Sequence, residues 1–352
     1  MLALATGCHS NDNNSSTPDS GIPDSGSPDS GTPDSGTPDS GTPDSGAPDA
    51  GSATDGGTPG TLTAVTSNPD ELLFALPLDA APSPDASKIY FIAIGANGGS
   101  IFSTSSTANS TASLLSSAGP LIAPLGLAVS TDGSKIYVAD PGAVTSSGND
   151  KGALLTVPAA GGDASIVAET VDFSPRAVAV SQVGGADEIV FIGTNKTANG
   201  DGTFSDGVFK DVGGTVTAVT TTGNPAAVAV ATDGTIYVLD QAGSISSFAV
   251  GATAGTALPG ASQTLNVSFP SGMDLSLDQT ALLVTGFDAT GAETINRVDI
   301  GSGTVTPLAL TPAISPAAHG GEPSGLHRAL SSDSFAFVDG SANTSGTIYL
   351  LK

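Results

Sequence analysis

Three residues able to carry acid–base or metal chemistry stand where the other copies of a repeated pattern have small residues. They are Asp79, Asp274 and His327, and residues of similar chemistry near the last of them are His319, Glu322 and Arg328. Carboxylates and imidazole together are the usual groups of an acid–base or metal site near neutral pH. The favoured alternative is an ion pair that only satisfies polar groups in the interior of the fold.

A second place with ligand chemistry is the polar loop at residues 195–206. Asn199, Asp201 and Asp206 offer oxygen atoms at a spacing that Ca²⁺ accepts, but Lys210 stands where a calcium loop would have its final Glu. A plain turn-rich loop is therefore the favoured interpretation. We expect no cofactor, with Ca²⁺ or another divalent ion as the alternative.

The sequence lacks the motifs of several other functions, including nucleophilic catalysis and phosphate binding. The sequence has no Gly-x-Ser-x-Gly elbow and no glycine-rich phosphate loop. Nine Lys and Arg against 34 Asp and Glu give a net charge of −25, which argues against nucleic acid as a partner. Trp is absent, which weakens the case for stacking on sugar rings. An enzyme is not the expected outcome.

The elements that must position these residues come from a repeat. Each copy has a Pro, a short apolar strand, a turn usually centred on Asp, and a β-branched or aromatic strand. Copies begin at Pro77, Pro124, Pro175, Pro225, Pro270 and Pro323, spaced 45 to 53 residues apart. A third strand follows in every copy, and fourth strands are predicted at residues 113–116, 164–168, 215–220, 263–267 and 304–308.

The sixth copy ends at Lys352 before any fourth strand, and residues 60–66 match residues 214–220 almost residue for residue. The N-terminal segment therefore supplies the missing strand. Four antiparallel strands per copy with such a closure avoid open sheet edges. The sequence predicts an all-β fold, a six-bladed β-propeller over residues 60–352 that is closed by an N-terminal strand.

The repeated pattern, clearest at residues 124–140 and 225–240, resembles the broad NHL, YVTN and gluconolactonase-like group of six-bladed propellers. The resemblance implies a fold and no particular chemistry. Hydrolytic members of the gluconolactonase and paraoxonase type hold a metal with Glu, Asn and Asp from several blades. Here most blades offer only Ala or Gly at those depths, which argues against that enzyme class.

The first 59 residues suggest where in the cell the protein is located. Residues 2–8 resemble the end of a lipoprotein signal, with Cys8 as the lipidation site, although Ala5 stands where Leu, Val or Ile is usual. We expect the signal to begin further upstream. Residues 9–59 include seven copies of a five-residue unit, six of them x-Pro-Asp-Ser-Gly and the last Ala-Pro-Asp-Ala-Gly, which favour a disordered, acidic linker. One cysteine allows no internal disulfide.

These features together predict a secreted protein, lipid-anchored to the outer membrane or cell surface. The propeller is expected to be a monomeric binding module for an extracellular protein or small ligand, touching the membrane only through its lipid. Its binding face is predicted from the loops at residues 140–151 and 195–206. The alternatives are a metal-dependent hydrolase or lactonase with a site near the propeller axis, and a coat protein without a ligand.

Overall fold

The computed structural model describes most of the chain from residue 60 onward. The described residues are 60–67, 73–117, 119–144, 152–197, 203–259, 265, 268–287, 292–314, 323–339 and 346–352. The predicted lipidation site and the acidic linker lie outside them. Within these ranges, no helix is long and apolar enough to cross a membrane.

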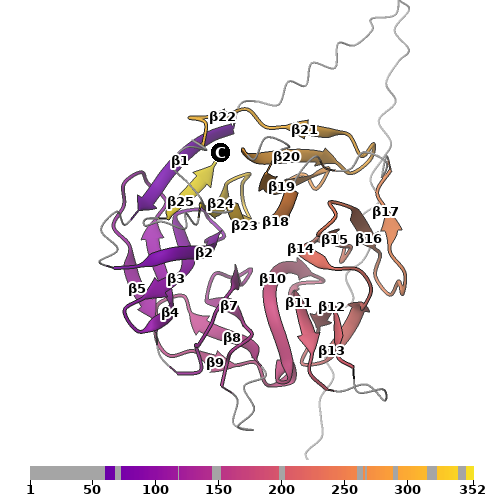
Figure 1. The fold of residues 1–352 in the computed structure, drawn as a ribbon, viewed down its shortest axis with the longest axis horizontal. Helices are drawn as coiled ribbons and strands as arrows, with labels where there is room; N and C mark the ends of the chain where they lie inside the picture. The colour runs from indigo at the N-terminus through magenta and orange to yellow at the C-terminus, as the bar shows by residue number, and fades with distance from the viewer. Residues whose placement is uncertain are drawn as a thin grey trace, which may run out of the picture. The chain divides into compact units, whose positions relative to one another are not determined.

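The fold is a six-bladed β-propeller, and its blades follow one another around a ring (Figure 1). Blade 1 contains β2 (Ala75–Pro82), β3 (Lys88–Gly95), β4 (Gly98–Ser105) and β5 (Ser113–Ser116). Blade 2 contains β6 (Gly126–Val129), β7 (Lys135–Asp140), β8 (Ala153–Pro158) and β9 (Ser165–Ile166). Blade 3 follows a short 3₁₀ turn, η1 (Ala168–Thr170), and contains β10 (Phe173–Val183), β11 (Ala186–Asn195), β12 (Ser205–Asp211) and β13 (Val216–Thr220).

The remaining blades repeat this order of strands. Blade 4 contains β14 (Pro225–Val230), β15 (Ile236–Asp240), β16 (Ile245–Phe248) and β17 (Thr256–Ala257). Blade 5 contains β18 (Ser268–Leu275), β19 (Ala281–Phe287), β20 (Glu293–Asp299) and β21 (Val305–Pro307). Blade 6 contains β23 (Pro323–Arg328), β24 (Phe335–Asp339), β25 (Thr347–Leu351), β1 (Gly60–Ser67) and β22 (Leu310–Thr311).

The predicted closure of the ring is confirmed. β1 pairs antiparallel with β25, and Thr61 and Lys352 exchange backbone hydrogen bonds of 2.8 and 2.9 Å. The short strand β22 adds a parallel partner on the outer side of β1, with Gly60 opposite Leu310. The last blade is therefore completed by the first strand of the propeller and extended by a fifth.

One strand prediction was wrong. The fourth strand of blade 4 is Thr256–Ala257, which pairs with β16, rather than residues 263–267. Most of the predicted segment lies outside the described residues. The outermost strand of this blade is only two residues long, so local β-propensity is a weak guide to its place.

The recurring Asp builds the turn between the first two strands of a blade. Asp132 accepts hydrogen bonds from the hydroxyl of Ser130 at 2.7 Å and the backbone N–H of Ser134 at 2.9 Å. The Ser130 hydroxyl in turn accepts from the N–H of Lys135 at 3.0 Å. Gly133 supplies the positive φ of 70° that the turn needs. The same arrangement recurs around Asp85 and Asp278.

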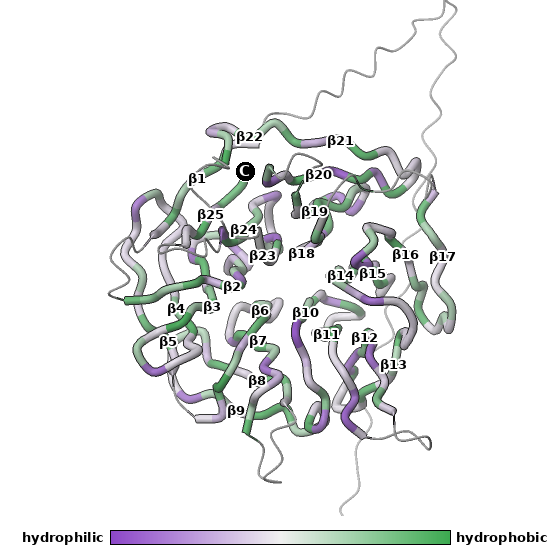
Figure 2. The backbone as a smooth tube through the Cα atoms, in the orientation of Figure 1, coloured by the Kyte–Doolittle hydropathy of each residue, from purple (hydrophilic) through white to green (hydrophobic). Residues whose placement is uncertain are grey.

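The core lies between neighbouring blades, where strands present apolar side chains to the next sheet. In Figure 2, hydrophobic segments recur in every blade. Phe74, Phe91 and Phe102 form one aromatic cluster with ring centroids 5.0 to 5.5 Å apart. Each is at most 2% exposed, and full burial of such a side chain contributes about 1.5–3 kcal/mol.

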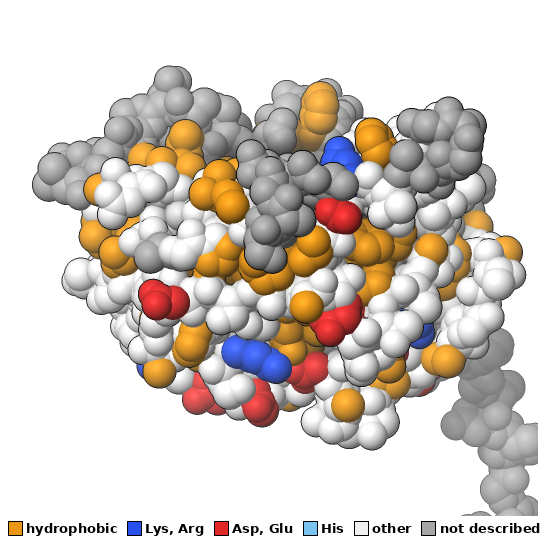
Figure 3. Space-filling view, turned by 90° about the horizontal axis from the view of Figure 1, so that it is seen from below, with side chains coloured by type: hydrophobic (Ala, Val, Ile, Leu, Met, Phe, Trp, Pro, Cys, Tyr) orange, Lys and Arg blue, Asp and Glu red, His pale blue; other side chains and the backbone are white. Residues whose placement is uncertain are grey.

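The two faces of the ring differ in their connections. We call the upper face the one formed by loops entering the innermost strands and loops between second and third strands; the lower face carries the other turns. Exposed large apolar side chains of the upper face are Leu73, Leu76, Ile94, Ile122, Leu125, Val144, Phe204 and Phe269. The edge-on view in Figure 3 shows hydrophobic side chains over much of the visible side, with acidic ones along its lower edge and at several places above it.

Candidate functional site

The six innermost strands approach one another so closely that small residues are required around the axis. A Cβ atom added to Gly272 would lie 2.4 Å from the backbone carbonyl carbon of Gly325. A Cβ added to Gly325 would lie 1.7 Å from Oδ1 of Asp79. The Ala and Gly pattern of the sequence is therefore a packing requirement at the centre of the ring.

Asp79 of blade 1 lies in this centre and joins three blades. Its Oδ1 accepts the N–H of Ala80 at 2.8 Å, and its Oδ2 accepts the N–H of Leu127, in blade 2, at 2.8 Å. His327, in blade 6, places its Nε2 atom 3.2 Å from the same Oδ2. The side chains of Asp79 and His327 are only 7% and 18% exposed.

Asp274 of blade 5 makes the same kind of contact with the next blade, closer to the lower face. Its Oδ1 accepts from the N–H of Leu275 at 2.7 Å, and its Oδ2 accepts from the N–H of Arg328, in blade 6, at 2.6 Å. The Arg328 guanidinium returns to the carbonyl oxygen of Leu275 at 2.7 Å. Each Asp thus ties its own strand to the backbone of the next blade.

Burial and charge oppose each other at this axis. Burial raises the pKa of Asp274, and the nearby His327 and Arg328 offset only part of that effect. Burial would lower the pKa of His327, but the charge and hydrogen bond of Asp79, with the charge of Asp274, outweigh it and raise that pKa above 6.5. The imidazole is therefore held toward its charged form by two carboxylates from different blades.

The structure brings together four residues of the predicted axial cluster, Asp79, Asp274, His327 and Arg328. The other two, His319 and Glu322, lie outside the described residues. In the described part of the chain, no group of three or more His, Cys, Asp or Glu residues is arranged to hold a metal ion. Because both carboxylates already accept backbone N–H groups, their geometry is that of an inter-blade tie.

Above Asp79, the upper face opens into a cavity of about 720 Å³, which we call the funnel. Every blade contributes to it: its lining is Asp79, Leu125, Gly126, Arg176, Ala177, Pro225, Ala226, Gln241, Phe269, Pro270, Ser271 and Gly325. His327 and Asp274 instead line a small cavity of about 70 Å³ toward the lower face. The Asp79–His327 contact thus lies between an open upper cavity and a narrow lower one.

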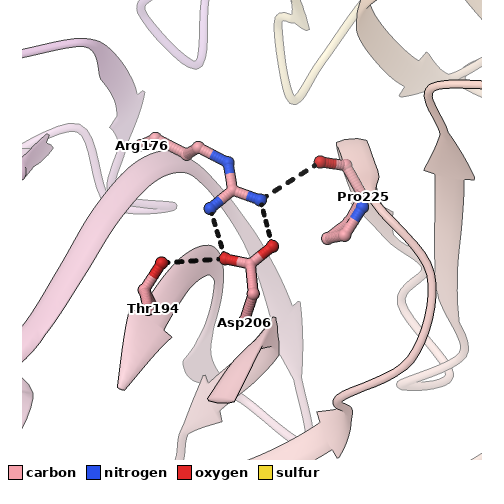
Figure 4. A network of polar contacts seen from close by, with 4 residues as sticks. All are labelled: Arg176, Thr194, Asp206 and Pro225. Atoms are coloured by element: carbon pink, nitrogen blue, oxygen red, sulfur yellow. Dashed lines mark hydrogen bonds and ion pairs between the residues drawn. The ribbon is translucent and has the colours of Figure 1, made fainter. Parts of the chain in front are cut away.

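Arg176 is the basic side chain of the funnel, and Figure 4 shows how it is held. Its two terminal nitrogens donate to both carboxylate oxygens of Asp206, at 2.7 and 2.9 Å, and one of them reaches the carbonyl oxygen of Pro225 at 3.4 Å. Thr194 donates its hydroxyl to Asp206 at 2.9 Å. A bidentate pair of this kind fixes the plane of the guanidinium.

The charge balance around Arg176 favours an ionised Asp206. Burial acts to raise the pKa of Asp206, but hydrogen bonds from Arg176 and Thr194 and the charges of Arg176 and Lys196 outweigh it, so the pKa lies below its ordinary value. Asp206 was one of three predicted calcium ligands, and here its carboxylate serves Arg176. The other two, Asn199 and Asp201, lie outside the described residues.

Two other blades give the funnel apolar walls. Phe269 is 67% exposed and adopts a positive φ of 53°, an uncommon conformation for an aromatic residue. Leu125 is 40% exposed on the blade across the ring. Gln241 and Ser271 add polar groups between these walls. The funnel therefore combines a fixed cation, an exposed aromatic ring and groups that can both donate and accept hydrogen bonds.

Sequence reasoning did not single out Arg176. It follows Pro175 in a copy of the repeat, beside the small residue Ala177, and nothing in its spacing distinguishes it. The sequence did hold one signal, because Arg176 is the only one of the nine basic residues that is next to a repeat-opening Pro. Asp140, at the end of β7, caps a loop: it accepts from the N–H groups of Ile122, Ala123 and Gly142.

Comparison with known proteins adds information about the fold. No family model and no curated protein matches the chain. A structural genomics protein of unknown function from Bacteroides thetaiotaomicron VPI-5482 superposes with a TM-score of 0.55 at 12% identity, over 84% of this chain and 76% of that one. A gluconolactonase from Xanthomonas campestris gives 0.53 at 14% identity, over 80% and 87%. The chain shares their fold.

TolB from Acinetobacter baumannii superposes with a lower TM-score of 0.46 at 13% identity, over 78% of this chain and 63% of that one. The two higher likenesses agree with the propeller group that the repeat resembled. At 12% and 14% identity they concern architecture alone. What the propeller does has to be argued from its own residues.

Proposed function

We propose that this protein is a lipid-anchored, extracytoplasmic binding protein whose propeller holds a small ligand in the funnel of its upper face. The observation that carries the proposal is the funnel itself, a cavity of about 720 Å³ lined by all six blades. Its size falls within the range of small-molecule sites, which combine apolar walls with a few fixed polar groups.

The unequal faces of the propeller support this assignment. On the lower face, neighbouring blades are joined through their turns, whereas the upper face exposes eight of the large apolar side chains found at the surface. Exposed apolar side chains around a concave polar site are typical of binding surfaces. The upper face is therefore the better place for a ligand.

The way the chain enters the propeller also fits a tethered module. β1 begins at Gly60 on the lower face, next to the C-terminal Lys352, as the hydrogen bonds between Thr61 and Lys352 require. A tether that joins the propeller there is compatible with a funnel that stays open to solvent. Lipidation of Cys8 remains part of the proposal.

The proposal is tested in two steps. Cells expressing the full chain or its Cys8→Ser variant are labelled with radioactive palmitate, and only the parent protein should incorporate label. Purified full-length protein is then screened against small-molecule mixtures by methyl NMR. Ligands should shift the signals of Leu125, in the funnel, and leave those of Leu277, on the lower face, unchanged; shifts confined to Leu277 would contradict the proposal.

A metal-dependent hydrolase or lactonase is the second proposal, favoured by the fold of the gluconolactonase neighbour and by Asp79 and His327 at the bottom of the funnel. Asp79 uses both carboxylate oxygens within the protein, which weighs against it. Elemental analysis of the full chain, with melting repeated after chelation, separates the two. A stoichiometric metal that is lost in Asp274→Ala would favour the hydrolase.

A further inference from the structure

The funnel has a local charge that contrasts with the rest of the chain. The protein carries a net charge of −25 and only nine basic residues. Two of them, Arg176 and Lys196, act on Asp206 in blade 3, and Arg176 is the one that lines the funnel. In so acidic a protein, a basic side chain in the lining of a cavity of this size requires an explanation.

Arg176 retains hydrogen-bonding capacity toward the cavity. A guanidinium carries five N–H donors, and three contacts with Asp206 and Pro225 use part of them. The side chain of Arg176 remains 32% exposed in the lining of the funnel. Because Asp206 and Thr194 already hold the guanidinium in place, a ligand would not have to order it.

The other charged residue in the lining of the funnel, Asp79, has a partner of opposite charge. Asp79, at the bottom, faces His327 at 3.2 Å, and that pair is neutral when the imidazole is protonated. Blade 5 offers the apolar surfaces of Phe269 and Pro270, and blade 2 offers Leu125. A ligand that satisfies these groups has an anionic end and an apolar body.

We infer that the ligand of the funnel is a small organic acid, whose carboxylate or phosphate contacts Arg176 while its apolar part lies on Phe269 and Leu125. This inference rests on the proposed binding function and adds the chemical class of the ligand. The anionic group contributes charge-assisted hydrogen bonds, and the apolar body is removed from water. A cavity of about 720 Å³ suits a molecule of this kind better than a folded partner.

The test uses three probes that share one apolar body and differ in charge: 4-phenylbutyrate, 4-phenylbutanol and 4-phenylbutylammonium. Their dissociation constants are measured by calorimetry on the full chain at low salt. The anion should bind about tenfold or more tightly than the alcohol, and the cation most weakly. Added salt should reduce the advantage of the anion.

Variants locate the two halves of the site. Arg176→Gln should remove most of the preference for the anion while leaving the alcohol unchanged, and Phe269→Ser should weaken all three probes. Arg297→Gln is the matched control, because Arg297 is a basic residue that lines a different cavity, between blades 5 and 6 near Gly60. Thermal melting of each variant checks that the fold is retained.

The possible failures are distinguishable. If the three probes bind equally and Phe269→Ser still weakens them, the funnel remains a binding site and the inferred class is overturned. If probes bind but neither Arg176→Gln nor Phe269→Ser changes that binding, the proposed function falls as well. If no probe binds at millimolar concentration, the small organic acid is excluded. The same follows if a peptide with a free C-terminal Phe, added as a fourth probe, is the only one that binds.

Discussion

The lower and upper faces of this propeller are built by different kinds of contact. On the lower face, turns of neighbouring blades bind one another: Thr131 donates to Asp187, Leu277 donates its N–H to Asp333, and Ser331 donates to the carbonyl oxygen of Pro84. On the upper face, Arg176 and Phe269 line an open cavity. The comparison indicates that one face holds the ring together and the other is available for a ligand.

Between the two faces, the innermost strands pack closely around the axis. A substitution there should have the largest effect on stability. Gly325→Ala places a Cβ 1.7 Å from Oδ1 of Asp79 at a φ of +66°, so the buried Asp79 carboxylate must move away from its hydrogen-bond partners. We expect a loss of about 3 kcal/mol or more in the free energy of unfolding. Denaturant unfolding measures it.

Gly184→Ala is the matched control on the lower face. Gly184 has a φ of +59°, but an added Cβ would meet nothing within 4 Å. Only backbone strain applies there, so the loss should be about 1–2 kcal/mol. Equal losses in the two variants would contradict the close packing assigned to the axis.

Asp79→Asn gives the next largest effect. The amide can still accept one N–H, but His327 loses its charged partner in a largely buried position. We expect a loss of about 2–3 kcal/mol in stability at pH 6. The histidine ring signals in NMR spectra should also report a fall in the pKa of His327; an unchanged pKa would show that Asp79 does not hold its charge.

The upper face should also respond to pH through Glu293. Burial and the neighbouring Asp339 raise the pKa of Glu293 from 4.5 to about 8. The folded state therefore disfavours the ionised form: the associated stability is fully present below pH 4.5 and is lost as pH rises toward 8. Glu293→Gln should raise the melting temperature by a few degrees at pH 8 and not at pH 4.

A melting temperature of Glu293→Gln that stays below the parent value at both pH values would contradict this account. The comparison with the lower face is direct, because the pKa of Asp278, in a turn of that face, is lowered by hydrogen bonds from Ser276 and Thr280. The pKa values of Glu293 and Asp278 thus shift in opposite directions. Asp278→Asn should lower the stability slightly at neutral pH, and this difference from the parent protein should disappear as pH falls below 4.

The smallest expected effect is that of a single tie on the lower face. Asp187→Ala removes the acceptor of Thr131 between blades 2 and 3, which should cost about 1 kcal/mol because the other ties remain. Binding in the funnel should be unchanged, which calorimetry with 4-phenylbutyrate can check. Loss of binding in this variant would show that the two faces are coupled.

The architecture could be predicted because it is repeated. Six copies of one hairpin fixed the blades, and the match between residues 60–66 and 214–220 identified the closing strand. The outermost strand of blade 4 could not be placed, since it has only two residues, Thr256 and Ala257, and so short a segment carries no alternating pattern. Repetition makes the inner strands predictable and leaves the outermost ones to tertiary packing.

The site was less predictable for a physical reason. Asp79, Asp274 and His327 stood out because they interrupt a pattern of small residues, and the structure brings them to the axis. Arg176 and Phe269 lie beside the repeat-opening Pro175 and Pro270, where the residue type changes from copy to copy, although both line the funnel. Sequence patterns therefore report the residues that hold blades together more readily than those that face a ligand.

The central claim is that the ligand binds on the upper face, and carbene footprinting of the full chain tests it most directly. The protein is labelled with and without the small-molecule fraction of the culture that produces it. Leu125 and Leu277 have similar exposed fractions, 40% and 44%, on opposite faces. The account predicts that labelling falls at Leu125 and Phe269 and stays constant at Leu277; protection at Leu277 without protection at Leu125 would contradict it.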